Sequence, residues 1–144
     1  LSSKNGLHLD FLADMDPQEA KAWLRAIDGV GPKTAACVLM FSLGKPVLPV
    51  DTHVYRVSRR LGLIDARTSA EAAHDVLEAM LSPEAIYHFH VHMIKHGRLV
   101  CKAQRPCAPE CVLQGECDYF KSVALGGLTA EPQGAQRNGE GKRL

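Results

Sequence analysis

Two glycines separated by a single residue lie between two helix-forming stretches, and this feature constrains the fold more than any other. The turn Gly29-Val30-Gly31-Pro32 follows an amphipathic stretch at 17–27 and precedes an almost wholly apolar stretch at 33–43. Glycine permits positive φ and proline suits the first turn of a helix, so one helix is expected to end and another to begin within this turn. The sequence therefore predicts a helical hairpin.

The rest of the chain also favours helices. Capping signals and apolar spacing predict further helices at 52–61, 69–81 and 83–97. Pro46 and Pro49 exclude a central strand between the second and third helices. A length of 144 residues with 46% apolar residues suits one compact domain. The expected fold class is all-α.

The hairpin turn has the chemistry of an anion site. Glycines allow successive backbone N–H groups to point the same way, and the following helix adds its partial positive charge. A phosphate of nucleic acid suits such a turn, and contacts of this kind position DNA without reading its sequence. A plain turn between two helices is the alternative interpretation.

Lys33 stands in the first turn of the second helix, and Asp51 stands directly before the predicted helix at 52–61. The helix field disfavours a cation at its N-terminal end, which favours a neutral and nucleophilic amine at Lys33. The alternatives are an ordinary exposed lysine and an aspartate that only caps the next helix.

Charge is segregated along the chain although the net charge is only +1. Residues 33–60 carry five bases against one acid, and residues 95–106 carry four bases and no acid. Residues 65–90 carry five acids against one base. Such a distribution is expected when one face meets a polyanion, while a solvated dipolar surface explains it equally well.

Four of the five cysteines cluster in one short segment, at Cys101, Cys107, Cys111 and Cys117. Five, three and five residues separate them. Clustered cysteines in an intracellular chain suggest metal binding before disulfides. An iron–sulfur cluster is the first interpretation and structural zinc is the second, because the spacing is not that of two CxxC pairs.

Taken together, Ile27–Ala35 and Val50–His53 resemble the helix-hairpin-helix of endonuclease III-type DNA glycosylases. His96-Gly97-Arg98 ahead of the cysteines matches the same family, and the resemblance covers about residues 7–120. Asp28 stands where the family usually has proline, and the second cysteine is displaced by one residue. The resemblance implies a partial helix-hairpin-helix DNA glycosylase fold with a C-terminal [4Fe-4S] loop.

The resemblance also implies roles. Lys33 would attack C1′ of the damaged nucleotide, and Asp51 would assist its deprotonation and stabilise positive charge on the sugar. The implied function is base-excision repair by a bifunctional glycosylase that removes oxidised pyrimidines and nicks the strand by β-elimination through a Schiff base. The alternative function is a non-catalytic helix-hairpin-helix DNA-binding fragment, and a metal-held interaction domain is a third hypothesis.

Binding roles follow in the same way. The implied partner is double-stranded DNA with damaged or abasic sites. The protein is expected to be a monomer that acts in the cytoplasm at the nucleoid and does not bind a membrane. The expected cluster ligands are the four clustered cysteines. The expected DNA contacts are Gly29, Val30, Gly31, Lys33, His53, Arg98, Lys102 and Arg105.

The expected organisation has three parts. Residues 1–62 form part of a six-helix barrel, with the helix-hairpin-helix at 17–43 and the catalytic loop at 44–53. Residues 63–121 hold the C-terminal helices and the cluster loop at 101–117. The glycine-rich residues 122–144 are expected to be a disordered tail. Leu1 is not a methionine, and we expect an N-terminal part of the natural protein to precede it.

Overall fold

The structure is a computed structural model that describes residues 8–104, 106 and 109–126. Within these ranges every regular element is a helix, and no strand is present. The elements are η1 (Asp10–Ala13), α1 (Pro17–Arg25), α2 (Pro32–Cys37), η2 (Val38–Ser42), α3 (Thr52–Leu61), α4 (Ala70–Ala79), α5 (Ala85–Leu99) and α6 (Asp118–Gly126). The expected all-α fold is confirmed for the described part of the chain.

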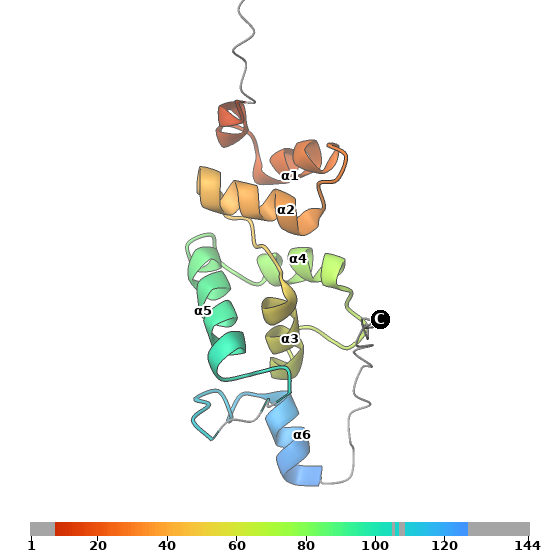
Figure 1. The fold of residues 1–144 in the computed structure, drawn as a ribbon, viewed down its shortest axis with the longest axis vertical. Coiled ribbons are helices and arrows are strands. Elements are labelled where there is room, and N and C mark those ends of the chain that lie inside the picture. The colour runs from red at the N-terminus through yellow and green to blue at the C-terminus, as the bar shows by residue number, and fades with distance from the viewer. Residues whose placement is uncertain (1–7, 105, 107–108, 127–144) are drawn as a thin grey trace, which may run out of the picture.

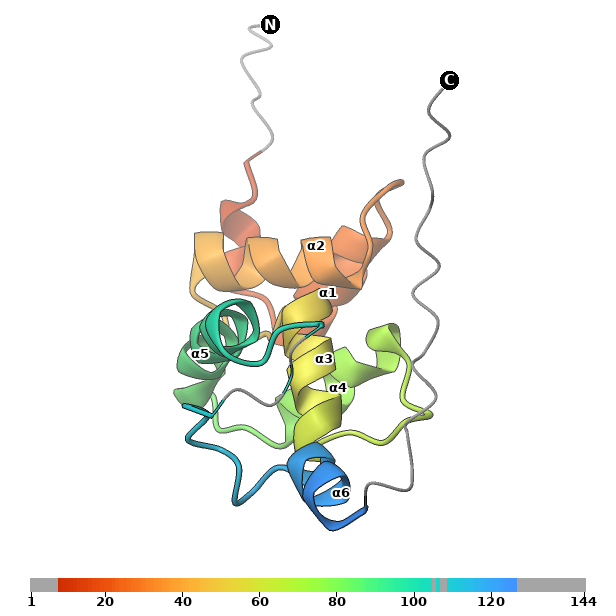
Figure 2. The same ribbon diagram turned by 60° about the horizontal axis from the view of Figure 1, so that its bottom comes forward.

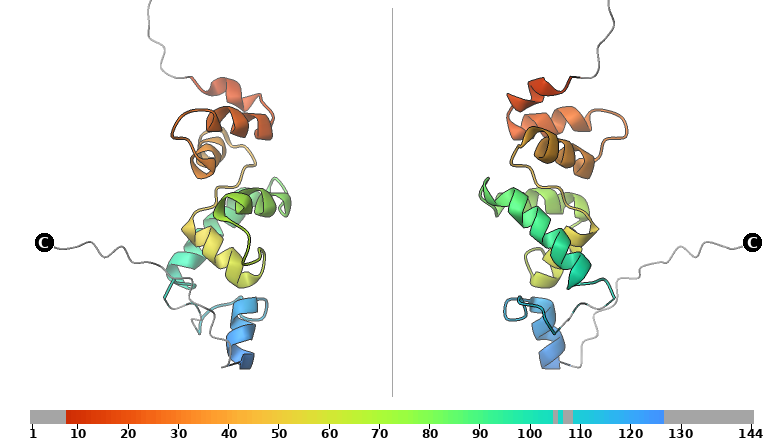
Figure 3. Two further views of the ribbon diagram at one scale, coloured as in Figure 1. Left: turned by 90° about the vertical axis from the view of Figure 1, so that its right-hand side faces the viewer. Right: turned by 60° about the vertical axis from the view of Figure 1, so that its left-hand side comes forward.

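The helices form three tiers along the long axis (Figures 1 and 3). η1, α1 and α2 with η2 form the first tier, and α3, α4 and α5 form the second. The cysteine segment and α6 form the third, in which α6 packs against the end of α3 (Figure 2). The loop from η2 to α3 connects the first tier to the second, so the turn before α2 and the start of α3 belong to neighbouring layers.

Side-chain caps determine where three of the helices begin. Asp16 accepts hydrogen bonds from the amides of Gln18 and Glu19 at the start of α1. Asp51 caps α3 and Ser69 caps α4 in the same manner. Each cap satisfies an amide that the helix itself leaves unpaired. The bounds expected for α3 are confirmed, and α5 begins and ends two residues later than expected.

The apolar helix after the hairpin changes its form halfway. α2 continues without a break into η2, a π-helical stretch that ends at Ser42. Ala35, Ala36 and Leu39 are buried as expected, whereas Phe41 is 56% exposed. The Phe41 ring lies on the outer side and packs edge-on against Tyr87 and His90 of α5. The expectation of a helix buried all round is therefore wrong at Phe41.

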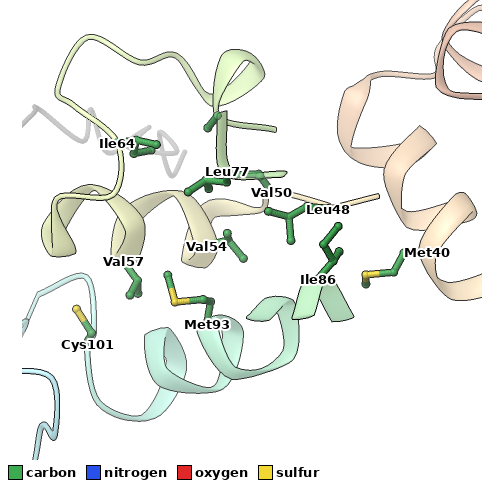
Figure 4. Packing of buried hydrophobic residues seen from close by; sticks show 11 residues of the cluster. Met40, Leu48, Val50, Val54, Val57, Ile64, Leu77, Ile86, Met93 and Cys101 are labelled. Carbon is green, nitrogen blue, oxygen red and sulfur yellow. The ribbon is translucent and has the colours of Figure 1, made fainter. Parts of the chain in front are cut away.

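Two buried clusters hold the tiers together. The first contains seven buried residues of the first tier and of the loop that follows it: Leu12, Ala20, Leu24, Ala35, Ala36, Leu39 and Val47. The second joins α3, α4 and α5, and Figure 4 shows its side chains meeting between these helices. Met40 reaches this second cluster from η2, and Cys101 reaches it from the cysteine segment. Burial of these apolar side chains is the main force that keeps the tiers in contact.

Charged side chains connect α1 to α4. Lys21 contacts Asp75 and Glu78 at 3.3 and 3.1 Å, and Arg25 pairs with Glu71. Two bases, Lys21 and Arg25, thus pair with three of the five acids that the sequence places in residues 65–90. Part of the acidic stretch is therefore paired within the chain, although the side chains of Asp75 and Glu71 stay largely exposed.

The end of the chain differs from the expectation in one respect. The disordered tail was expected from residue 122, but α6 continues through these positions to Gly126. Asp118 in the first helical turn and the run Val123-Ala124-Leu125 favour helix here, and the first glycine appears only at its end. Residues 127–144 lie outside the described part. Among the described helices, none is long and apolar enough to cross a membrane.

Candidate active site and cysteine-lined pocket

The hairpin turn leaves its backbone open on the outside. Gly29 has φ +83°, a conformation that favours glycine, and Gly31 is extended at φ −89° and ψ 178°. A Cβ added at either glycine would have no other atom within 4 Å. The amides of Gly31, Lys33 and Thr34 have no hydrogen-bond partner among the described residues. The turn thus presents free N–H donors in open space.

Lys33 is the second residue of α2, and its side chain is exposed. No ion pair joins Lys33 to Asp51 in the described part of the chain. The amine is accessible to a large ligand, and it lies in the same helical turn as the free amides of Lys33 and Thr34.

Asp51 is half-buried at the N-cap of α3. Its Oδ1 accepts a hydrogen bond from the amide of Val54 at 2.8 Å. Oδ2 has no partner among the described residues. The capping role expected from the sequence is confirmed, and one carboxylate oxygen stays available for a second role.

Lys33 and Asp51 act electrostatically on the same neighbours, although they do not touch. Burial raises the pKa of the Cys37 thiol, the charge of Lys33 opposes this shift, and the charge of Asp51 adds to it. Burial lowers the pKa of His90, the hydrogen bond to Pro49 and the charge of Asp51 raise it, and the charge of Lys33 lowers it. Because Coulomb interactions weaken with distance, charges that act on both Cys37 and His90 must lie near both. Lys33 and Asp51 therefore lie in the same region, where the first tier meets the second.

The other expected DNA contacts are distributed over two elements. His53 is half-buried on α3, where its Nδ1 lies 3.2 Å from the guanidinium of Arg56. Arg98 is exposed on α5 and lines a surface groove with Lys95 and Phe41. Lys102 is exposed in the cysteine segment. Arg105 lies outside the described residues.

Three basic residues of the 33–60 stretch have partners inside the protein. Lys45 donates to the carbonyls of Ala13 and Met15. Arg56 donates to the carbonyls of Gly97 and Cys101 at 2.8 and 3.1 Å. Arg60 donates to two carbonyls of the cysteine segment. Most of the basic excess in this stretch is therefore structural, which weakens the argument from charge segregation alone.

Three of the four clustered cysteines line one pocket. Cys101, Cys111 and Cys117 surround it, and Cys107 lies outside the described residues. The remaining lining is mostly apolar and comes from α3, α5, α6 and the segment itself: Val57, Arg60, Leu61, His96, Pro106, Leu113, Gln114 and Phe120. The structure therefore brings together the described members of the expected ligand set.

Polar groups surround the sulfur atoms of this pocket. The guanidinium of Arg60 donates to Cys101 Sγ at 3.3 Å, and the amide of Phe120 lies 3.5 Å from Cys117 Sγ. His96 Nε2 lies 3.7 Å from Cys111 Sγ. Donors aimed at sulfur suit thiolate ligands, whose negative charge they stabilise. No three His, Cys, Asp or Glu side chains within the described ranges form a single-ion site.

Sequence reasoning missed Arg56, Arg60 and His74. The arginines were counted as part of a basic face, although they lie four residues apart on α3 and both point to the cysteine segment. The helical spacing was visible in the sequence, but the identity of the partner was not. His74 was not singled out, because no local pattern indicates its buried contact with the loop before α3.

Comparison with known proteins gives a consistent picture. No family model matches the chain. Endonuclease III of Sulfolobus acidocaldarius is 33% identical over 112 residues, which are 78% of this chain and 50% of that protein. Endonuclease III of Thermotoga maritima is 39% identical over 103 residues, covering 72% and 48%. DNA glycosylase/AP lyase ROS1 of Arabidopsis thaliana is 28% identical over 92% of this chain and 11% of its own length.

Two solved structures are similar in fold as well. A non-covalent endonuclease III–DNA complex has a TM-score of 0.66 at 35% identity, over 78% of this chain and 51% of the other. A trapped endonuclease III–DNA covalent intermediate has the same TM-score at 38% identity, over 72% and 49%. The chain therefore spans about half the length of the endonuclease III relatives that it matches.

The described part of the chain is all-helical, with a glycine hairpin, a lysine in the next turn and a downstream cysteine pocket. It is a helix-hairpin-helix protein with the fold of a DNA glycosylase. Over the residues that the comparisons cover, it is endonuclease III-like. The resemblance noted in the sequence is thereby confirmed.

Proposed function

We propose that this chain carries the amine and the carboxylate of a bifunctional DNA glycosylase and AP lyase. The observation that carries the proposal is the arrangement around α2. Free amides and an exposed Lys33 stand at the start of this helix, and Asp51 lies near enough for both charges to act on Cys37 and His90. Similarity to two endonuclease III–DNA complexes, one of them covalent, supports it.

In the first chemical step, the lone pair of Lys33 Nζ forms a bond to C1′ of the deoxyribose. The glycosidic C–N bond breaks, and its electron pair leaves with the base, which takes up a proton. Opening of the sugar ring then gives an imine. Loss of a C2′ proton breaks the C3′–O bond, the strand is nicked with a 5′-phosphate end, and water hydrolyses the imine to restore the amine.

Asp51 has two tasks in this scheme. Its Oδ1 keeps α3 capped, while Oδ2 accepts the proton of Lys33 or faces the positive charge that develops on the sugar. The damaged base must leave the stack to be reached, because C1′ chemistry of this kind is blocked inside a duplex. Oxidised pyrimidines are the proposed substrates.

The turn amides and the exposed basic side chains of Arg98 and Lys102 are proposed to hold the DNA backbone. The proposed partner is duplex DNA with a damaged or abasic site, bound by a monomer, and this role places the protein at the nucleoid. Arg56 and Arg60 are left out of the proposed DNA face because their guanidinium groups are turned inward.

The cysteine-lined pocket is proposed to hold a [4Fe-4S] cluster. Cys101, Cys111 and Cys117 would ligate it with Cys107 as the fourth ligand, and the apolar lining with donors to sulfur fits such a group. When bound, the cluster supplies a cross-link between the segment and α3, together with redox-active iron. An iron and sulfide assay separates this proposal from structural zinc.

Borohydride trapping on duplex DNA with one abasic site tests the proposal. The chain is expected to form a covalent adduct, and Lys33→Ala is expected to form none while still binding a reduced abasic-site analogue. Lys121→Ala is the matched control, because this exposed lysine lies on α6 and should leave the adduct unchanged. Binding without any adduct in the unmodified chain would establish the non-catalytic DNA-binding function instead.

Asp51→Asn separates the capping role from the chemical one. Asparagine caps a helix about as well as aspartate, so the variant should melt at the same temperature as the parent. The rate of adduct formation should fall by roughly 10²–10³-fold, because the charge that faces the reacting sugar is gone. An unchanged rate would reduce Asp51 to a cap.

Gly31→Ala tests the turn. The residue has an ordinary φ and open space around a Cβ, so the protein should fold as before. The added methyl group occupies the space in which a phosphate would approach the amides, and affinity for DNA should fall. Equal affinity of parent and variant would remove the turn from the DNA interface.

A further inference from the structure

The chain before Asp51 is a buried loop, which is an unusual environment for irregular backbone. Val47, Leu48 and Pro49 are fully buried, and Val50 is 5% exposed. Loops normally run over the surface, because buried N–H and C=O groups need partners that irregular backbone does not supply. The polar groups of this loop must therefore be satisfied by side chains from elsewhere.

Helix α4 supplies two of these partners. His74 Nε2 accepts a hydrogen bond from the amide of Val50 at 3.1 Å, and Glu78 Oε2 accepts one from the amide of Leu48 at 2.9 Å. Alternate amides of an extended chain point the same way and lie about 6.6 Å apart. Helix residues four apart are offset by about 6 Å along the axis, so His74 and Glu78 match the spacing of these two amides.

The contacts of His74 define its tautomer. Nε2 carries no hydrogen because it accepts from Val50, and Nδ1 lies 3.0 and 3.2 Å from the carbonyls of Ala70 and Glu71. Nδ1 therefore carries the proton and donates to the helix backbone.

Helix α5 contributes the second histidine. His90 is 4% exposed, and its Nδ1 donates to the carbonyl of Pro49 at 2.9 Å. The ring also packs edge-on against Phe41 with 5.5 Å between centroids. His74 and His90 thus contact the N–H and the C=O of one peptide group, Pro49–Val50, from two different helices.

We propose that His74 and His90 are positioning residues that hold the Pro49–Val50 backbone and thereby set the position of the Asp51 carboxylate. This inference rests on the proposed function of Asp51. A misplacement of about 1 Å in a reacting group can cost on the order of 10²-fold in rate. A loop without regular structure needs such external contacts to keep its next residue in place.

The test compares two pairs of variants in the full chain. His74→Gln keeps an acceptor at the position of Nε2, and His90→Asn keeps a donor at the position of Nδ1. His74→Leu and His90→Leu remove these groups. The leucine variants should form the borohydride adduct at least tenfold more slowly at unchanged affinity for DNA, and the amide variants should stay within about threefold of the parent.

Amide hydrogen exchange at Val50 is the second measurement. His74→Leu should exchange this amide at least tenfold faster than His74→Gln does, because the acceptor is lost in the first and retained in the second. Unchanged exchange, or equal adduct rates in the leucine and amide variants, would overturn the inference. If the parent forms no adduct, the proposed function fails, and exchange at Val50 still decides whether the histidines hold the loop.

Discussion

Glu78 connects three parts of the fold, and its removal gives a sharp test of how they are held. Oε1 accepts from Lys21 and Gln18 of α1, while Oε2 accepts from the amide of Leu48 in the buried loop. Glu78 itself belongs to α4. Glu78→Ala should therefore loosen α1, α4 and the loop before Asp51 in a single step.

The magnitude follows from the burial of the partners. Side-chain exposure is 13% for Lys21 and 11% for Glu78, so the pair is largely desolvated. Removing one partner of a buried pair costs about 3–5 kcal/mol, and an unsatisfied buried amide costs about 1–3 kcal/mol. Lys21 keeps Asp75 as a weaker partner, so we expect a total of about 3 kcal/mol.

Asp75→Ala is the matched control on the same lysine. The Asp75 side chain is 78% exposed, and exposed pairs are worth about 0–1 kcal/mol. Thermal and urea unfolding followed by circular dichroism should give a decrease in Tm of roughly 10 °C for Glu78→Ala and at most about 3 °C for Asp75→Ala. Equal decreases for both variants would refute the argument that burial determines the strength of this pair.

Three further predictions concern other parts of the chain. Gly62 has φ +87° at the end of α3, and a Cβ there would also collide with the Asp118 carboxylate, so Gly62→Ala should destabilise by at least about 1–2 kcal/mol in urea unfolding, while Gly115→Ala should be nearly neutral. Arg60→Gln removes the charged donor to Cys101 and should raise the rate of iron release to a chelator about tenfold. Burial lowers the pKa of His90, so the unfolded chain binds its proton more readily. The free energy of unfolding should therefore be highest above about pH 6.5 and decrease below it. The decrease should be shallower in His90→Asn.

The helices could be predicted because their signals are local. Asp16 and Asp51 each stand directly before the helix that they cap, and the glycines of the hairpin lie in the turn that requires them. Where the prediction was wrong, the deciding partner was remote. Phe41 was expected to be buried on the strength of its own helix, but the rings that it meets belong to α5, more than forty residues away.

The candidate site divides in the same way. Lys33 and Asp51 are proposed as site residues from short motifs, because one turn and one cap present them. The residues that hold the loop before Asp51 are not marked by any motif. His74 resembles a surface residue on an amphipathic helix, and only the fold shows that its ring meets a loop that precedes it by more than twenty residues.

Asp51 caps α3 and is also the proposed catalytic carboxylate, so one residue accounts for both the capping motif and the proposed catalytic motif. A side chain that caps α3 through Oδ1 is held by the amide of Val54, so its second oxygen has a defined direction without any further contact. The backbone of the same residue is extended, and the loop before it is held by His74 and His90. The carboxylate is therefore constrained from both sides of its Cα, by the helix that follows and by two histidines that hold the preceding Pro49–Val50 peptide. A glutamate, whose longer side chain caps poorly, would lose the constraint from the helix that follows, so a short side chain is needed at this position.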